Sequence, residues 1–169
     1  MTTGSGEGFL MKELLEPSVR LALERRPQAR LVRIAGFGLR ENGRIVPMAP
    51  RNWVCRWEFA FCSAAEEPGL FSYHSVSYLQ WNKPQYSDVA GNVSETEPFD
   101  DETLAGIADS DELVEIFASI SGFRPMAGHD DDFVAITMRR PLDPVAYMHN
   151  RHGQWAMIDP LGREVIKAL

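Results

Sequence analysis

Hydrophobic and polar positions alternate most regularly between residues 53 and 62. The even-numbered positions of this stretch include Arg56 and Glu58, whereas its odd-numbered positions are all large or apolar. Successive side chains of a β-strand point to opposite faces of a sheet, so a period of two predicts a strand with one buried face. The side chains predicted to lie on that face are Trp53, Cys55, Trp57, Phe59 and Phe61.

Helical periodicity appears in three other segments. The spacing of apolar residues between positions 9 and 26 predicts an amphipathic helix, in which Pro17 either introduces a kink or marks the start of a second helix. A short helical turn is expected over residues 101–107. Asp109, followed by Glu112 three residues later, fits a capping box at the start of a further helix.

The remaining apolar stretches are typical of strands separated by turns. The Asn42-Gly43 dipeptide favours a tight turn, and residues 150–153 favour a hairpin connection. Residues 82–100 are rich in polar residues, proline and glycine, so we expect a linker or a long loop there. Further strands are predicted over residues 29–39, 71–81, 133–139, 144–148 and 154–158, with a last extended segment at 165–166.

This order of elements predicts an α+β protein in which helices pack on an antiparallel β-sheet. A helix followed by antiparallel strands occurs twice, which favours two related helix-plus-sheet units that either stand apart or form one compact domain. The expected organisation is a flexible tail at 1–8, a first unit at 9–81, the linker or long loop at 82–100 and a second unit at 101–169.

Two stretches of this pattern carry a resemblance to known folds. In the first half, the helix from Leu14-Leu15 to Pro27 is followed by the strand Leu31-Val32-Arg33-Ile34. In the second half, the helix at 111–122 precedes a strand that runs through Trp155-Ala156-Met157-Ile158 into the turn Asp159-Pro160-Leu161-Gly162. The pattern resembles PepSY-like and cystatin-like α+β domains, in which a helix lies across a curled antiparallel sheet. The resemblance implies regulation, inhibition or binding instead of catalysis, and it supplies no catalytic residues.

Charge is distributed unevenly along the chain, whose formal net charge is -7. Residues 1–85 hold 11 Lys and Arg against 8 Asp and Glu, whereas residues 86–169 hold 6 against 16. Binding to nucleic acid needs clustered cations, so the acidic second half argues against it. A basic protein partner would complement the acidic half through electrostatic steering, although a solvated acidic surface also accounts for the excess.

Other sequence features point to a cytoplasmic protein. No run of about 18 apolar residues is present, so no membrane contact is expected, and the first residues lack the basic start and apolar run of a signal peptide. Cys55 and Cys62 would lie on opposite faces of one strand, about 23 Å apart. They are therefore expected to form neither a disulfide nor a shared metal site, as is usual in a reducing compartment.

One sheet face is a candidate ligand- or partner-binding surface. If the odd-numbered positions of the second hairpin strand also face the helix, its core residues are Phe71, Tyr73, Leu79 and Trp81. The even-numbered positions of both strands then share the opposite face, where a concave surface could bind a ligand or a partner. Packing in the core alone also explains the aromatic residues of this hairpin. The candidate site residues are Arg56, Glu58, His74 and Tyr78.

Metal ligation has weaker support. His129, Asp130 and Asp132 offer suitable ligand atoms, but their spacing is not that of an EF-hand and fits a solvated loop. His149 and His152 flank a turn without a third ligand or a partner that would make either a general base. No metal or other cofactor is therefore expected.

The favoured function is a non-enzymatic binding or regulatory protein that acts through protein–protein interaction, for instance an immunity or inhibitor-type protein that blocks a basic partner. One alternative is a small-molecule-binding domain with a cavity between the helix and a curled sheet. The other is a hydrolase-type enzyme that uses His74, His129 or His149 with acidic residues, which nothing in the sequence places together. A homodimer formed through an edge strand such as residues 70–81 is also open.

Overall fold

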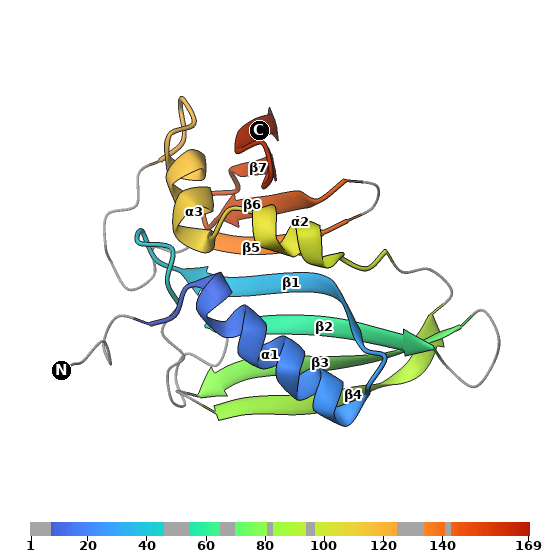
Figure 1. Ribbon diagram of the computed structural model, residues 1–169. Helices are drawn as coiled ribbons and strands as arrows, with labels where there is room; N and C mark the ends of the chain where they lie inside the picture. The colour runs from blue at the N-terminus through green and yellow to red at the C-terminus, as the bar shows by residue number, and fades with distance from the viewer. Residues whose placement is uncertain are drawn as a thin grey trace.

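The computed structural model describes residues 8–45, 55–64, 70–80, 83–93, 97–124, 134–140 and 143–169. Within them, eight antiparallel strands form one sheet in the order β4-β3-β2-β1-β5-β6-β7-β8, and the helices lie on one face of this sheet (Figure 1). The α+β class with an antiparallel sheet is thus confirmed. The elements are α1 (Met11–Arg25), β1 (Arg30–Leu39), β2 (Arg56–Ala64), β3 (Phe71–Gln80), β4 (Lys83–Val93), α2 (Asp101–Gly106), α3 (Ser110–Ala118), β5 (Val134–Arg139), β6 (Val145–Asn150), β7 (Trp155–Asp159) and β8 (Glu164–Ala168).

The alternating pattern of β2 fixes the helix-covered face of the sheet. Trp57, Phe59 and Phe61 are fully buried on this face, whereas Arg56 and Glu58 lie on the opposite face and keep partial contact with solvent. Cys55 packs against the helix-side core and Cys62 belongs to a small apolar cluster on the other face, and neither forms a disulfide. The prediction that Cys55 and Cys62 lie on opposite faces of the sheet is confirmed.

Helix α1 covers the half of the sheet that contains β1, β2 and β3. It runs through Pro17 as one helix, so the alternative of a second helix beginning there is wrong. The hydroxyl of the next residue, Ser18, donates to the Leu14 carbonyl oxygen at 2.6 Å and shares a 3.0 Å hydrogen bond with Tyr78 Oη. The buried face of α1 consists of Met11, Leu14, Ser18 and Ala22.

The starts of α1 and α3 meet at one place, which we call the helix-start junction. The backbone N–H of Met11 donates to Ser110 Oγ and that of Lys12 donates to Asp109 Oδ1, both at 3.0 Å. Asp109 is also the N-cap of α3 and accepts from the Ser110 N–H, and Glu112 completes the predicted capping box. Four backbone N–H groups are unsatisfied at each helix start, so residues of α3 supply partners that α1 lacks.

A third segment, the turn after β1, completes the junction. The left-handed backbone of Gly43 (φ 75°) lies directly against the backbone of Ser110 and Asp111, so close that an added Cβ would collide with Asp111. Next to it, Arg44 Nη1 donates to the Gly8 carbonyl oxygen at 3.0 Å. The predicted Asn-Gly turn is confirmed, and the reason for its glycine is both its conformation and this contact.

The prediction of a linker or long loop over residues 82–100 is wrong for most of that range, because Lys83–Val93 form strand β4. This strand lies at the edge of the sheet, where Pro84 removes no hydrogen bond that the sheet needs. Strand β3 lies between β2 and β4, so it is not the edge strand that the predicted homodimer through residues 70–81 requires. Among the described strands, the two edges of the sheet are β4 and β8. None of the described helices has the length and apolar character needed to cross a membrane.

Substituting Gly43 tests the contact between the turn and α3. We expect Gly43→Ala to lower the free energy of unfolding by roughly 3 kcal/mol, because it adds a backbone clash to the strain of a left-handed residue. Gly153→Ala is the matched control: its φ is 78° but nothing lies within 4 Å of the added Cβ, so a cost of only about 1 kcal/mol is expected. Urea denaturation of both variants measures the difference, and equal costs would contradict the contact.

Candidate functional site

The four predicted site residues lie on two faces of the sheet instead of one. In the antiparallel register Trp57 pairs with Tyr78 and Phe61 pairs with His74, so both β3 residues face the helices. Only Arg56 and Glu58 lie on the opposite face, and the predicted grouping of the four is wrong. Large side chains occur at both odd and even positions of β3, so the alternation of its sequence does not determine which set of side chains is buried under the helices.

Tyr78 is a core residue. It is 3% exposed, packs edge-on against Phe59 and hydrogen-bonds the Ser18 hydroxyl of α1. Burial raises the pKa of Tyr78, and the hydrogen bond to Ser18 opposes this shift. Its contacts therefore hold α1 on the sheet and leave no free hydroxyl for a ligand.

His74 is also buried, at 1% exposure, between the rings of Phe61 and Tyr86 at centroid distances of 5.5 and 5.3 Å. Neither ring nitrogen has a hydrogen-bond partner among the described residues. Burial lowers the pKa of His74, the nearby charge of Arg26 lowers it further, and Asp88 acts in the opposite direction. Burial between the two rings therefore favours the neutral form of the imidazole.

A polar cluster covers His74 and connects the end of α1 to β4. Arg26 Nη2 donates to Asp88 Oδ1 at 2.8 Å, and the Tyr86 hydroxyl donates to the same oxygen at 3.1 Å. The Arg25 guanidinium lies 5.3 Å from the centre of the Tyr86 ring. Because Asp88 is bound by Arg26 and Tyr86, it gives His74 no hydrogen bond of the kind a catalytic histidine uses.

The structure does not bring the other candidate histidines to His74. His149 is paired with Ala135 and Trp155 on the opposite face of the sheet, and His152 lies in the exposed turn after β6. The metal candidates His129, Asp130 and Asp132 lie outside the described residues. Within those residues, no three His, Cys, Asp or Glu side chains gather as metal ligands would.

On the helix-free face, which we call the outer face, Arg56 and Glu58 belong to a charged network. Glu58 accepts from Arg33 Nη2 at 2.6 Å and lies 3.6 Å from Arg56 Nε. The Arg56 guanidinium lies 5.0 Å from the centre of the Phe37 ring. The sequence offered no signal for Arg33, because its membership depends on the pairing of β1 with β2.

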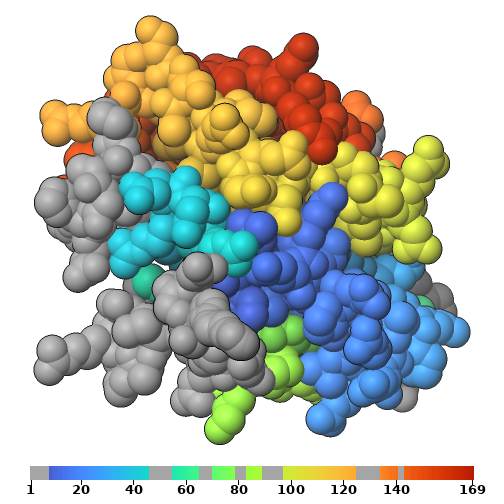
Figure 2. Space-filling view, turned by 60° about the vertical axis from the view of Figure 1, so that its left-hand side comes forward, coloured from blue at the N-terminus to red at the C-terminus, as the bar shows by residue number. Residues whose placement is uncertain are grey.

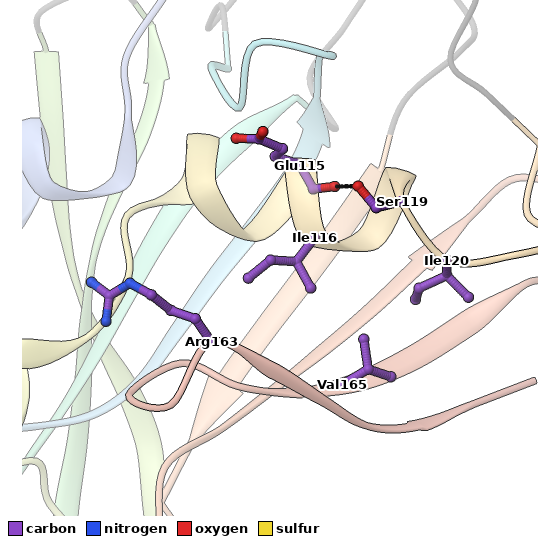
Figure 3. A pocket seen from close by; sticks show the side chains of 6 residues that line it. All are labelled: Glu115, Ile116, Ser119, Ile120, Arg163 and Val165. Atoms are coloured by element: carbon purple, nitrogen blue, oxygen red, sulfur yellow. Dashed lines mark hydrogen bonds between the residues drawn. The ribbon is translucent and has the colours of Figure 1, made fainter.

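A second site, the α3–β8 pocket, is a surface hollow of about 360 Å³ between helix α3 and strand β8. The helix and the strand lie side by side at the surface (Figure 2). Ile116 and Ile120, one helical turn apart, approach Val165 across the hollow (Figure 3). The lining residues are Glu115, Ile116, Ser119, Ile120, Arg163 and Val165.

The hairpin between β7 and β8 holds this pocket in place. Arg163 has a left-handed backbone (φ 58°), which costs a residue other than glycine about 1 kcal/mol. Its side chain donates to Glu112 Oε2 at 2.8 Å and to the Leu161 carbonyl oxygen at 3.0 Å. The hydrogen bond from Arg163 lowers the pKa of Glu112. The turn at 159–162 was predicted, but Ile116 and Ile120 resemble ordinary core residues in the sequence, so the pocket was not.

Glu115 is the acidic residue in the lining of the α3–β8 pocket, and Glu112 is joined to the pocket through its ion pair with Arg163. Asp111 and Glu115 are exposed on α3, and Asp101 and Glu102 are exposed on α2. None of these four forms an ion pair with another described residue. No family model, curated protein or solved structure matches this chain.

The buried imidazole of His74 makes stability depend on pH. The folded-state pKa is below the unfolded value near 6.5, so the unfolded chain binds more protons and the free energy of unfolding falls as the pH drops below about 6.5. We expect His74→Phe to remove this part of the pH dependence and to stabilise the protein by about 1 kcal/mol at neutral pH, because two buried unpaired nitrogens are lost.

Urea denaturation between about pH 5 and pH 7.5 measures both effects. The matched control is His149→Gln, which replaces an exposed histidine on β6 and should leave the slope intact. A His74→Phe protein that keeps the wild-type slope would refute this assignment.

Proposed function

We propose that this chain is a non-enzymatic binding or regulatory protein, and that the α3–β8 pocket receives an apolar side chain from a basic protein partner. The observation that carries the proposal is a surface hollow in which two isoleucines of α3 and Val165 lie beside the exposed carboxylate of Glu115. A partner that offers an apolar residue next to lysine or arginine would match both properties.

Exposed apolar side chains around the pocket support the first part. Val165, which lines the pocket, is 42% exposed, and Ile166 and Leu169 along the same edge of the sheet are 54% and 66% exposed. Scattered exposed apolar residues need no explanation, but a group beside a hollow is typical of an interaction site.

The charge around the pocket supports the second part. Glu115 lines the pocket without an ion pair to a described residue, whereas the lining cation Arg163 is paired with Glu112. Exposed carboxylates of α2 and of the first turn of α3 add negative charge to the same side of the sheet. A negative potential of this kind raises the rate at which a basic partner associates, and salt screens it.

An immunity or inhibitor-type protein that occupies a basic partner is a specific form of this proposal. Cys55 and Cys62 form no disulfide, which fits action in the reducing cytoplasm. We also propose that the chain contains two related units, because the sheet order reads outward from the central β1–β5 pair as β1-β2-β3-β4 and as β5-β6-β7-β8. A helix on an antiparallel sheet in each half is the feature shared with PepSY-like and cystatin-like domains.

The small-molecule alternative has less support from the described residues. It requires a cavity between α1 and the sheet, but side chains from both elements fill that space. Met11 on α1 and Trp57 and Phe59 on β2 are fully buried in a single core cluster. The enzyme alternative has less support still, because His74 and His149 lie on opposite faces.

The proposal is tested with a synthetic peptide in which one leucine has two lysines on each side. We expect it to shift backbone amide resonances of residues 111–120 and 163–166, and to bind several-fold more weakly at about 500 mM than at about 50 mM salt. Ile120→Asn should weaken binding by about fivefold, because it removes an apolar wall of the pocket.

Three controls accompany this titration. A peptide with serine in place of leucine should lose the shifts near Ile120, and Leu23→Asn should bind as the wild type does, because Leu23 is an exposed leucine on α1. A peptide with glutamates in place of lysines should not bind the pocket. Shifts scattered over the whole acidic surface, or equal effects of Leu23→Asn and Ile120→Asn, would overturn the proposal.

A further inference from the structure

We propose that the outer face of the sheet is a second binding surface, which takes an acidic segment of a protein partner with a carboxylate between Arg33 and Arg139. The inference rests on the register and charge of the central strands and is independent of the α3–β8 pocket. It assigns to this face a partner of opposite charge to the one proposed for the helix side.

The register brings two arginines together at the centre of the outer face. Arg33 of β1 is the direct partner of Arg139 of β5, and Arg33 also pairs with Ala60 of β2. Directly opposite residues of antiparallel strands have Cβ atoms about 5 Å apart and point to the same face. Arg33 also belongs to the charged network with Glu58 and Arg56 of β2, so the pair of Arg33 and Arg139 lies beside that network.

The charges in this cluster are not balanced. One carboxylate, that of Glu58, serves both Arg33 and Arg56, and Arg139 forms no ion pair with a described residue. Like charges directly opposite each other destabilise a sheet. Arg33 shares the carboxylate of Glu58 with Arg56, and Arg139 has no anion among the described residues that would relieve its repulsion from Arg33. A guanidinium has the planar shape that binds a carboxylate through two hydrogen bonds.

The surroundings of the pair suit an extended polypeptide. Next to Arg33 and Arg139, the adjoining row of the outer face holds Ala35 and Thr137, and then Tyr147, which is 39% exposed. Ala35 is fully buried, so the surface that a peptide side chain can contact is that of the half-buried Thr137 and the exposed ring of Tyr147. None of the described helices packs on this face: its buried cluster of Val32, Ala60 and Cys62 contains strand residues alone.

An acidic protein segment fits better than a nucleic acid. Nucleic-acid affinity depends on many phosphate contacts made by clustered cations. The cluster at the centre of this face consists of Arg33, Arg56 and Arg139 with one glutamate among them, on a chain whose net charge is -7. A short run of carboxylates with an aromatic residue can satisfy Arg33 and Arg139 without bringing a long polyanion to an acidic protein.

The test uses a peptide in which one tyrosine has three glutamates on each side, titrated at low salt into the full isotope-labelled chain. We expect shifts of backbone amides in residues 33–37 and 135–139, and at least about fivefold weaker binding by Arg139→Gln. Arg20→Gln, which removes the same charge from an exposed site on α1, should bind within about twofold of the wild type.

Further measurements separate the possible outcomes. Ile120→Asn should bind the acidic peptide normally, so failure of the pocket proposal would not affect this one. Arg139→Gln should keep or raise the urea midpoint, since it relieves repulsion from Arg33; a lowered midpoint would refute that repulsion. The inference is overturned if the peptide does not bind, if Arg20→Gln weakens binding as much as Arg139→Gln, or if single-stranded oligothymidylate binds this face more tightly.

Discussion

The helix-start junction is the constraint on which the arrangement of the molecule depends. Asp109 Oδ1 accepts hydrogen bonds from the first turns of both α1 and α3, and Gly43 lies against the α3 backbone beside them. Each unsatisfied N–H at a helix start costs free energy, and a cap is worth about 1 kcal/mol. One short segment supplies acceptors for N–H groups at the starts of both helices, and it therefore holds both helices on the same face of the sheet. The position of α3 in turn determines the width of the α3–β8 pocket.

The local patterns of the chain predicted most of the elements, because each depends on neighbours in sequence. The alternation in β2, the Asp109–Glu112 capping box and the Asn42-Gly43 turn all belong to this class. Strand β4 was missed because proline, glycine and polar residues are typical of loops, although an edge strand tolerates them. The face of β3 was assigned wrongly because a shift of one residue reverses which side chains are buried, and its residues at both parities are large enough to fill a core.

The candidate sites were less accessible to sequence analysis, since each joins residues from distant parts of the chain. Ile116 and Val165 meet because α3 packs against β8, and Arg33 and Arg139 meet because β1 pairs with β5. No local pattern encodes those pairings. Arg56 and Glu58 were identified from the alternation of β2 alone, but their partner Arg33 was not. His74 illustrates the opposite case, because a histidine that looks chemically useful in the sequence is packed between two aromatic rings.

The net charge of the chain does not show how the fold distributes charged side chains over the two faces of the sheet. Exposed carboxylates of α2 and α3 lie on the helix side of the sheet, whereas Arg33, Arg56 and Arg139 lie together on the outer face with Glu58. A sheet is one layer thick, so a partner on one face does not cover the other. Two arginines directly opposite each other lower the stability of a sheet. Residues that lower stability in this way tend to occur where function requires them. Net charge alone favours a basic partner, whereas the distribution of charge over the two faces is the basis for proposing a basic partner on one face and an acidic partner on the other.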